Sequence, residues 1–210
     1  STVEQRFYGV SDDDKRGVIR QILRDRSIRQ AIVFGNSKLG VARLARSFER
    51  DGLRTAALHG DKSQDERLKS LDAFKRGEVD LLVATDVAAR GLDIADLPAV
   101  FNFDVPFNAE DYVHRIGRTG RAGASGLAVT LVTRADARLV ADVERLIKRK
   151  GEGEPFEVEA ERPRFESRRR REEAPAEEAP APRASRPAFR PAAPSADPFF
   201  DKPYESSERV

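Results

Sequence analysis

Leu81-Leu82-Val83-Ala84 and Ala31-Ile32-Val33-Phe34 are two uninterrupted apolar runs of strand length. A strand without polar positions belongs in a parallel sheet whose two faces are both covered, because every side chain then meets an apolar layer. Further β-rich runs accompany these two, so that the expected strands span residues 3–10, 30–34, 55–58, 80–84, 99–104 and 126–132. The sequence therefore predicts a buried sheet.

Helical patterns separate these strands. Val41, Leu44, Ala45 and Phe48 follow the i, i+3, i+4, i+7 spacing of one helix face, and similar apolar spacing recurs over residues 68–74 and 139–147. Strands that alternate with helices through short links predict an α/β fold: a mostly parallel sheet with helices on both faces and right-handed crossovers. Ligands of such a sheet bind beyond the carboxyl ends of its strands.

The composition changes sharply near residue 151. Residues 151–210 hold ten of the twelve prolines, no leucine or isoleucine, and 11 basic against 14 acidic side chains, whereas residues 1–150 hold 27 basic and 22 acidic ones. A segment so poor in apolar side chains does not bury enough surface to offset the entropy of ordering it. We therefore expect a folded, basic domain over residues 1–150 and a disordered tail over residues 151–210.

The residue types that are missing exclude several classes of protein. The chain holds no cysteine and only two histidines, which excludes disulfides, thiolate metal sites and cysteine nucleophiles and leaves too few ligands for a histidine-rich metal site. No run reaches the roughly 18 apolar residues of a membrane span, and neither a signal peptide nor a G-x-x-x-x-G-K-[ST] phosphate loop occurs. Because the chain starts at Ser1 and contains no methionine, we expect a piece of a longer protein with a missing partner domain.

The strongest local signal is the segment His114-Arg115-Ile116-Gly117-Arg118-Thr119-Gly120-Arg121. Its three arginines recur at every third residue, and the glycines between them let the backbone turn tightly and approach a ligand closely. A guanidinium group binds phosphate oxygens bidentately and stays charged at any working pH. The segment predicts a phosphate site in which the three guanidinium groups lie together at the rim of the sheet; the alternative is a solvated basic turn.

A second signal follows the expected strand that ends at Ala84. Thr85-Asp86 has the residue types of a helix cap, and the free amides at the start of a helix bind phosphate. Gly91 ends this short helix and places Asp93 close by, where a carboxylate accepts hydrogen bonds from ribose hydroxyls. A strand–helix unit with an ordinary cap explains the same residues.

Two weaker signals follow other strands. After the strand that ends at Leu58, Ser63 and Glu66 have the spacing of a capping box, and Arg67 is placed to reach a backbone phosphate. In Phe34-Gly35-Asn36-Ser37-Lys38, a buried strand ends in small polar residues. A helix cap alone explains each of these segments as well.

Together, the four segments resemble the second RecA-like domain of DEAD-box RNA helicases, in the order that the family has. Phe34–Lys38 looks like its motif IV, Gln64–Arg67 like the segment after it, Ala84–Asp93 like motif V and His114–Arg121 like motif VI. The resemblance covers about residues 1–150, implies a three-layer RecA-like fold, and is nearest to bacterial members in its short spacing. Ser37 stands where the family often has threonine, and the hydroxyl is retained.

The resemblance implies an ATP site shared with an absent first RecA-like domain, which carries the phosphate loop, the DEAD carboxylates and Mg²⁺. Arg118 and Arg121 match the arginine fingers that reach the γ-phosphate, in a reaction that depends mostly on positioning and electrostatics. Asp93 matches the ribose contact, with Gly91 in the same cofactor-binding loop.

The resemblance also implies contacts to RNA and to the first domain. Ser37, Gly60, Arg67 and Thr85 match contacts to the sugar-phosphate backbone, so weak base specificity is expected. Four further residues match positions at the boundary between the two domains: Gln64, Arg90, His114 and Arg115.

The function implied is the C-terminal half of a cytoplasmic, ATP-dependent RNA helicase that opens duplexes locally, with this chain inactive by itself. A free-standing RNA-binding module without enzymatic activity is the alternative. A DNA-tracking ATPase of the same superfamily is a third, against which His114-Arg115 argues. The tail is interpreted either as a solvated linker or end, or as an RNA tether that uses Arg168–Arg171.

Overall fold

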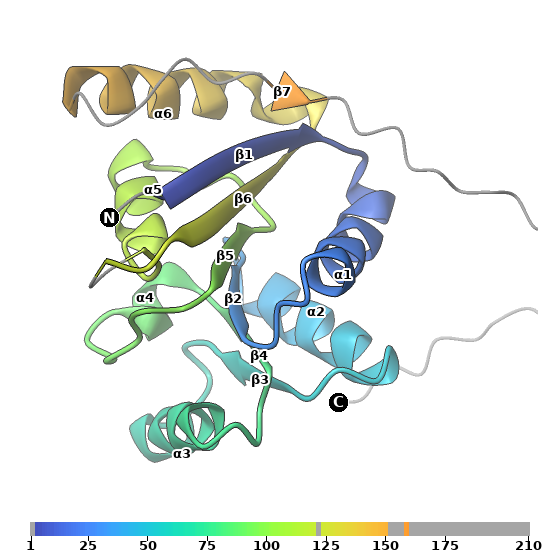
Figure 1. Ribbon diagram of the computed structural model, residues 1–210. Helices are drawn as coiled ribbons and strands as arrows, with labels where there is room; N and C mark the ends of the chain where they lie inside the picture. Colours follow the sequence, from blue (N-terminus) through green and yellow to red (C-terminus); the bar gives the residue numbers. More distant parts are fainter. Residues whose placement is uncertain (1–2, 121–122, 151–157, 160–210) are drawn as a thin grey trace, which may run out of the picture. The chain divides into compact units, whose positions relative to one another are not determined.

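The computed structural model describes residues 3–120, 123–150 and 158–159, and these form an α/β domain (Figure 1). Its sheet has the strand order β3-β4-β2-β5-β6-β1-β7, and all of its paired strands are parallel. The strands are β1 Val3–Gly9, β2 Ala31–Phe34, β3 Thr55–Leu58, β4 Leu81–Ala84, β5 Ala99–Asn102, β6 Gly126–Val132 and β7 Val158–Glu159. The predicted fold class is confirmed.

Helices follow the strands as expected. They are α1 Lys15–Asp25, α2 Lys38–Arg50, α3 Gln64–Lys75, α4 Asp86–Ala89, α5 Ala109–Ile116 and α6 Ala137–Lys150, with single 3-10 turns at Asp12–Asp14 and Arg134–Asp136. Each of α2, α3 and α4 starts at a capping hydroxyl, from Ser37, Ser63 and Thr85 respectively. These caps satisfy amides that no helical carbonyl reaches.

The six expected strands are all present, and their ends agree with the expected ranges to within two residues. One strand was not expected. Val158–Glu159 pairs with Phe7 and Tyr8 of β1, inside the stretch for which the sequence predicts disorder. The sheet therefore extends beyond the boundary at residue 150, because even a two-residue segment can satisfy free backbone groups of an edge strand. The rest of the expected tail, residues 160–210, lies outside the described residues.

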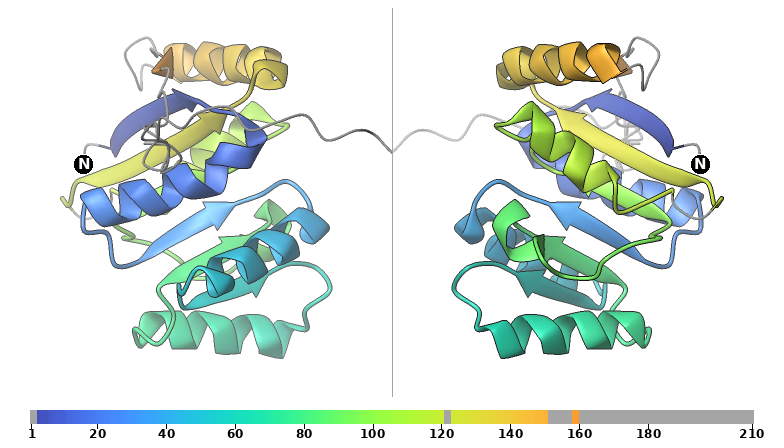
Figure 2. Two further views of the ribbon diagram at one scale, coloured as in Figure 1. Left: turned by 90° about the vertical axis from the view of Figure 1, so that its right-hand side faces the viewer. Right: turned by 90° about the vertical axis from the view of Figure 1, so that its left-hand side faces the viewer.

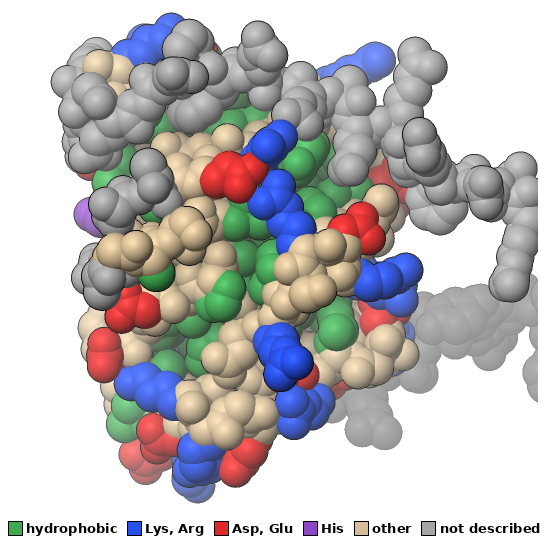
Figure 3. All heavy atoms as spheres, in the orientation of Figure 1, with side chains coloured by type: hydrophobic (Ala, Val, Ile, Leu, Met, Phe, Trp, Pro, Cys, Tyr) green, Lys and Arg blue, Asp and Glu red, His purple; other side chains and the backbone are tan. Residues whose placement is uncertain are grey.

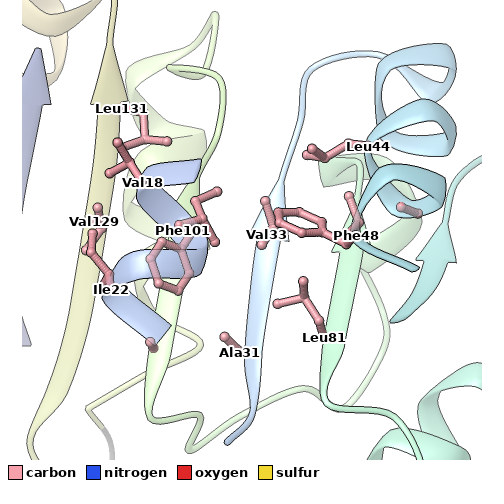
Figure 4. Close-up of a cluster of buried hydrophobic side chains, with 14 of the residues drawn as sticks. Val18, Ile22, Ala31, Val33, Leu44, Phe48, Leu81, Phe101, Val129 and Leu131 are labelled. Carbon is pink, nitrogen blue, oxygen red and sulfur yellow. The ribbon is translucent and has the colours of Figure 1, made fainter. Parts of the chain in front are cut away.

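One face of the sheet is covered by α1 and α2 (Figure 2, left). Val18 and Ile22 of α1 and Leu44 and Phe48 of α2 pack on alternate residues of the strands, which point to the same face. Figure 4 shows how these side chains meet, together with Ala31, Val33, Leu81, Phe101, Val129 and Leu131. This layer forms the larger apolar core and fixes both helices on one side.

The opposite face is covered by α3 and α4, with α5 and α6 beside the β1 and β6 end (Figure 2, right). Leu71 and Phe74 of α3 pack against Ile32, Phe34 and Leu82. Tyr112 of α5 stacks on Phe7 with ring centroids 5.9 Å apart, and Val143 and Ile147 of α6 complete that cluster. Because both faces are covered, the four-residue strands β2, β4 and β5 are buried throughout.

Candidate functional site

The carboxyl edge of the sheet gathers polar loops from four strands. β2, β3, β4 and β5 are parallel, so the loops that follow them open on the same edge. These loops begin at Gly35, His59, Thr85 and Phe103. Most of the residues that the sequence singles out lie in these loops or on the helices that follow them.

Arg115 is at the centre of a buried polar network behind this edge. Its Nε and Nη2 donate to the two carboxylate oxygens of Asp86, each at 2.7 Å. Its Nη1 donates to the carbonyl of Asp104 at 2.8 Å and to Asn102 Oδ1 at 3.3 Å, and its Nη2 also donates to Asn36 Oδ1 at 2.8 Å. The guanidinium thus ties the loops after β2, β4 and β5 to α5.

This arrangement corrects the expectation for Arg115. The residue is only 1% exposed and lies over the Phe34 ring, 5.2 Å from its centroid. A buried guanidinium stays in place only when carboxylates and carbonyls satisfy its donors, and here they do. Arg115 therefore holds the interior together and does not lie at the rim of the sheet, where the sequence predicted it.

Arg118 takes a different position, against the loop that follows α4. Its Nη1 donates to the carbonyls of Leu92 at 3.1 Å and Ile94 at 3.2 Å, and its Nη2 reaches the carbonyl of Ala89 at 3.5 Å. The side chain is half-buried. These carbonyl dipoles orient the guanidinium group of Arg118.

Asp93 lies between Leu92 and Ile94, whose carbonyls both accept hydrogen bonds from Arg118. Its carboxylate is 87% exposed and accepts a hydrogen bond from Lys75 Nζ at 3.3 Å. Gly91, with φ of +74°, supplies the left-handed turn that starts this loop. The structure therefore brings the predicted ribose contact and one predicted finger to the same loop. Arg121 lies outside the described residues.

Two glycines fix the turn beyond Arg118. Gly120 has φ of +71°, and a Cβ at Gly126 would lie 2.6 Å from the Gly120 amide nitrogen and would collide with the Thr119 hydroxyl. Thr119 in turn donates to the carbonyl of Leu97, and the Leu97 amide donates to the carbonyl of Arg118 at 3.0 Å. The backbone of Arg118 is thus anchored on both sides.

The four expected RNA contacts follow the strands β2, β3 and β4. Ser37 and Gly60 are exposed, and Lys38 Nζ links their loops by donating to Asp61 Oδ1 at 2.8 Å. This hydrogen bond lowers the pKa of Asp61. Thr85 is only 9% exposed, and its hydroxyl already accepts a hydrogen bond from the Ala88 amide at 3.3 Å as the cap of α4.

Arg67 and Gln64 lie on the first turns of α3. Gln64 is exposed at the first helical position, after a complete capping box between Ser63 and Glu66. Hydrogen bonds from Ser63 lower the pKa of the Glu66 carboxyl. Arg67 is half-buried, and its Nε has no hydrogen-bond partner within the described part of the chain. This nitrogen is itself buried, whereas a guanidinium group binds phosphate through donors that remain accessible.

Arg90 and His114 meet at one carboxylate. Arg90 Nη2 donates to Asp111 Oδ1 at 3.0 Å, and His114 Nδ1 lies 3.9 Å from the same oxygen. Both side chains are more than half exposed, at 61% and 68%. The structure therefore brings these two predicted boundary residues together on the surface of α4 and α5.

Several residues of the network were missed by the sequence reasoning. Asn36, Asn102, Asp104 and Asp111 hold Arg115 or Arg90 and were assigned no role. Asn102 is the one that a signal could have found, because it is a fully buried amide at the end of an apolar strand and therefore needs a polar partner. The others are common loop residues without a distinctive pattern.

Two negative observations bear on the class of site. Within residues 3–120, 123–150 and 158–159, no group of three or more His, Asp or Glu side chains is arranged to hold a metal ion. None of the described helices combines the length and the apolar character needed to cross a membrane.

Comparison with known families identifies the domain type. The family described as helicase conserved C-terminal domain matches residues 14–123. The chain is 45% identical over 150 residues to the DEAD-box ATP-dependent RNA helicase CshA of Geobacillus kaustophilus, covering 71% of this chain and 32% of that protein. It is 44% identical over 157 residues to the ATP-dependent RNA helicase RhlB of Xanthomonas oryzae, covering 75% and 27%. The chain thus spans about a third of the length of these curated relatives.

Solved structures agree with this result. The Escherichia coli DEAD-box protein SrmB, bound to regulator of ribonuclease activity A, superimposes with a TM-score of 0.68 at 34% identity, over 76% of this chain and 91% of that one. The RNA helicase Prp28 of Chaetomium thermophilum, bound to ADP, gives a TM-score of 0.66 at 36% identity, over 72% and 38%.

Proposed function

We propose that this chain, which belongs to the helicase conserved C-terminal domain family and is the C-terminal domain of a DEAD-box RNA helicase, supplies one wall of an ATP site and half of an RNA-binding cleft. The other half of each lies on a first RecA-like domain of the same protein. The observation that carries the proposal is the loop of residues 91–94, where Arg118 holds the carbonyls on either side of the exposed Asp93.

The residues of this loop fit a nucleotide. The Asp93 carboxylate accepts hydrogen bonds from ribose hydroxyls, and the Arg118 guanidinium places a fixed positive charge near the phosphates. Arg121 supplies the second charge. We assign Mg²⁺ to the first domain, where the phosphate loop and the DEAD carboxylates of the family lie. Charge stabilisation of this kind accounts for rate effects of roughly 10³-fold or more in phosphoryl transfer.

RNA binds along the carboxyl edge of the sheet in this proposal. Ser37, Gly60 and the partly unpaired Arg67 contact the sugar-phosphate backbone, and Thr85 contributes through its short capped helix. Backbone contacts position a strand without reading its sequence. The protein is therefore expected to act on RNA of many sequences.

ATP binding and RNA binding are coupled in this proposal, because the loops that contact them are held by the same side chains. Arg115 ties the loops after β2, β4 and β5 together, and Asp86, its ion-pair partner, is adjacent to Thr85. Gln64, Arg90 and His114 contact the first domain when the cleft closes around ATP and RNA. Closure bends the bound strand and opens the duplex locally, and hydrolysis with product release reopens the cleft.

The decisive experiment joins this chain to a first RecA-like domain and measures RNA-stimulated ATP hydrolysis. Arg118→Gln and Arg121→Gln are each expected to lower kcat by roughly 10³-fold, while the exposed Arg134→Gln leaves it unchanged. The isolated chain is expected to hydrolyse no ATP. Near-normal turnover in both variants contradicts the finger assignment.

The same experiment separates the non-enzymatic alternative. Arg118 already donates to three carbonyls, and this role in fold stability suffices for an RNA-binding module. If RNA binds and no ATP hydrolysis appears in any joined protein, the module is the better interpretation. We further propose a cytoplasmic helicase and a domain boundary near residue 160, after β7, with the remaining tail as a linker or an RNA tether.

A further inference from the structure

The positive charge of the domain is concentrated in one stretch. Residues 15–51 hold ten basic and three acidic side chains, whereas the rest of residues 1–150 hold 17 basic and 19 acidic ones. This stretch consists of α1, β2 and α2, and β2 is buried. The excess charge of the domain therefore lies on the two helices that cover one face of the sheet.

The arginines of α2 lie on its solvent side. Val41, Leu44, Ala45 and Phe48 of this helix are buried against the sheet. Arg43, Arg46 and Arg50 have the i, i+3, i+7 spacing of the opposite side, and all three are exposed. At 1.5 Å per residue, this row extends for about 10 Å along the helix.

A second row lies on α1. Arg16, Arg20 and Arg24 are spaced by four residues, while Val18 and Ile22 point into the core. α1 and α2 cover the same face of the sheet, as Figure 2 shows on the left. Figure 3, which looks at the amino edge, shows Lys and Arg side chains in the region of α1 and α2.

Part of this charge is neutralised, because Lys15, Arg26 and Lys38 each lie within ion-pair distance of a carboxylate. The Asp51 carboxylate forms ion pairs with two arginines: its Oδ2 lies 3.0 Å from Arg16 Nε, and its Oδ1 lies 3.7 Å from Arg20 Nη1. Within the described ranges, no carboxylate lies within ion-pair distance of Arg24, Arg43, Arg46 or Arg50, and Arg50 donates to the Ser47 hydroxyl at 3.0 Å. Among the residues that the structure describes, these four exposed guanidinium groups have no counter-charge.

The row on α2 starts next to the carboxyl edge. The helix is capped by Ser37, one of the proposed RNA contacts, and Arg43 lies between one and two turns further along. An RNA strand that passes Ser37 would meet Arg43, Arg46 and Arg50 in succession. The outer row on α2 offers one exposed large hydrophobic residue, Leu39, whereas protein interfaces depend on buried aromatic or aliphatic anchors. A nucleic-acid backbone therefore fits this surface better than an acidic protein does.

We propose that the outer faces of α1 and α2, defined by Arg20, Arg24, Arg43, Arg46 and Arg50, form a second RNA-backbone site that extends the path of the strand beyond the carboxyl edge. Guanidinium groups bind phosphates bidentately and without sequence preference. The inference rests on the proposed function, since it assumes RNA at that edge. It predicts that long RNA binds more tightly than RNA that fills the edge alone.

The test titrates the 210-residue chain with fluorescent oligouridines of 6 and 20 nucleotides in low and moderate salt. In Arg43→Gln/Arg46→Gln/Arg50→Gln, affinity for the 20-mer is expected to fall about tenfold, with the salt dependence shallower by about two in log–log slope, because about three phosphate contacts are lost. Affinity for the 6-mer is expected to stay unchanged. The matched control, Arg134→Gln/Arg138→Gln/Arg145→Gln, removes three exposed charges from a different face and is expected to change neither.

The outcomes separate this inference from the proposed function. Equal 20-mer affinity in the α2 variant and the control overturns the second site, whereas weaker 6-mer binding in Arg67→Gln still supports RNA at the edge. Binding of polyglutamate that depends on the three arginines, with RNA binding unchanged, also overturns the RNA site in favour of an acidic protein partner. If the unaltered chain binds neither RNA in low salt, the proposed RNA function fails together with the inference. Urea unfolding of each variant verifies that the fold is intact.

Discussion

Arg115 of α5 and Asp86 of α4 form a bidentate ion pair, with both N–O distances at 2.7 Å. The two residues are 29 positions apart in sequence, so the pair joins α4 to α5. Arg115 is almost completely buried. Because Asp86 is the residue after Thr85, the ion pair fixes the position of the loop that follows β4. Its role is therefore to position the edge at which RNA and nucleotide are proposed to bind.

Removing one partner of this pair is expected to destabilise the fold strongly. Arg115→Leu leaves the Asp86 carboxylate, two amides and a carbonyl without their donor, which corresponds to a loss of about 3–5 kcal/mol in the free energy of unfolding. Urea unfolding measures it, with the exposed Arg134→Leu as the control. Because the two side chains act as one unit, Arg115→Leu/Asp86→Asn is expected to lose less than the sum of the single variants. A loss below about 1 kcal/mol in Arg115→Leu contradicts this account.

Arg118 is expected to stabilise the loop of Asp93 independently of any ATP chemistry. In the isolated chain, Arg118→Gln removes charge-assisted hydrogen bonds to the carbonyls of Leu92 and Ile94, each worth about 1.5 kcal/mol or more. Faster amide hydrogen exchange at Leu92 and Ile94, with unchanged exchange in β2, is the expected result. Unchanged amide exchange at Leu92 and Ile94 would show that the hydrogen bonds from Arg118 do not stabilise this loop.

Two glycines are expected to differ strongly in how much stability an added methyl group costs. Gly126→Ala forces a Cβ against Thr119 and the Gly120 amide, so we expect a loss of about 1–3 kcal/mol in unfolding free energy. Gly60 has open space around its Cβ position and no positive φ, so Gly60→Ala is expected to change stability by less than about 0.5 kcal/mol. If RNA approaches Gly60 closely, Gly60→Ala nevertheless weakens RNA binding, which anisotropy with an oligouridine measures. Unchanged RNA affinity removes Gly60 from the interface.

Glu4 is expected to make stability depend on acid pH. Its hydrogen bonds with Arg26 and then Arg6 lower the pKa of the carboxyl from 4.5 to about 2. A lowered pKa contributes stability that is fully present above 4.5 and is lost as the pH falls toward about 2. Because the side chain is largely exposed, Glu4→Gln is expected to cost only about 0.5–1 kcal/mol at pH 7. Thermal unfolding between pH 2 and pH 7 measures the difference, which should shrink through that window; a constant difference contradicts it.

Much of the fold could be predicted because its signals are local. The apolar runs that become β2 and β4 and the 3.6-residue period of α2 are visible in short windows, and both were confirmed. Val158–Glu159 was missed because its pairing with β1 depends on a neighbour about 150 residues away in sequence and on no feature of its own composition.

The candidate site was predicted less completely. Residue types and spacing pointed to Asp93 and Arg118, and the structure places both at one loop. The regular spacing of the arginines also predicted that Arg115 lies at the rim of the sheet, but its side chain is buried in the interior. Asn36, Asn102 and Asp104 explain this difference, because they surround the guanidinium with acceptors that no sequence window contains.

The amino-acid sequence by itself determined the alternation of strands and helices, the parallel sheet and the edge at which polar loops gather, since these follow from periodicity and from short links. Only the tertiary structure decided which arginines are available to a ligand. Equal spacing along the chain does not mean equal surroundings, because a guanidinium is retained inside the protein only where separate strands bring carboxylates and carbonyls to it, and it stays accessible where they do not.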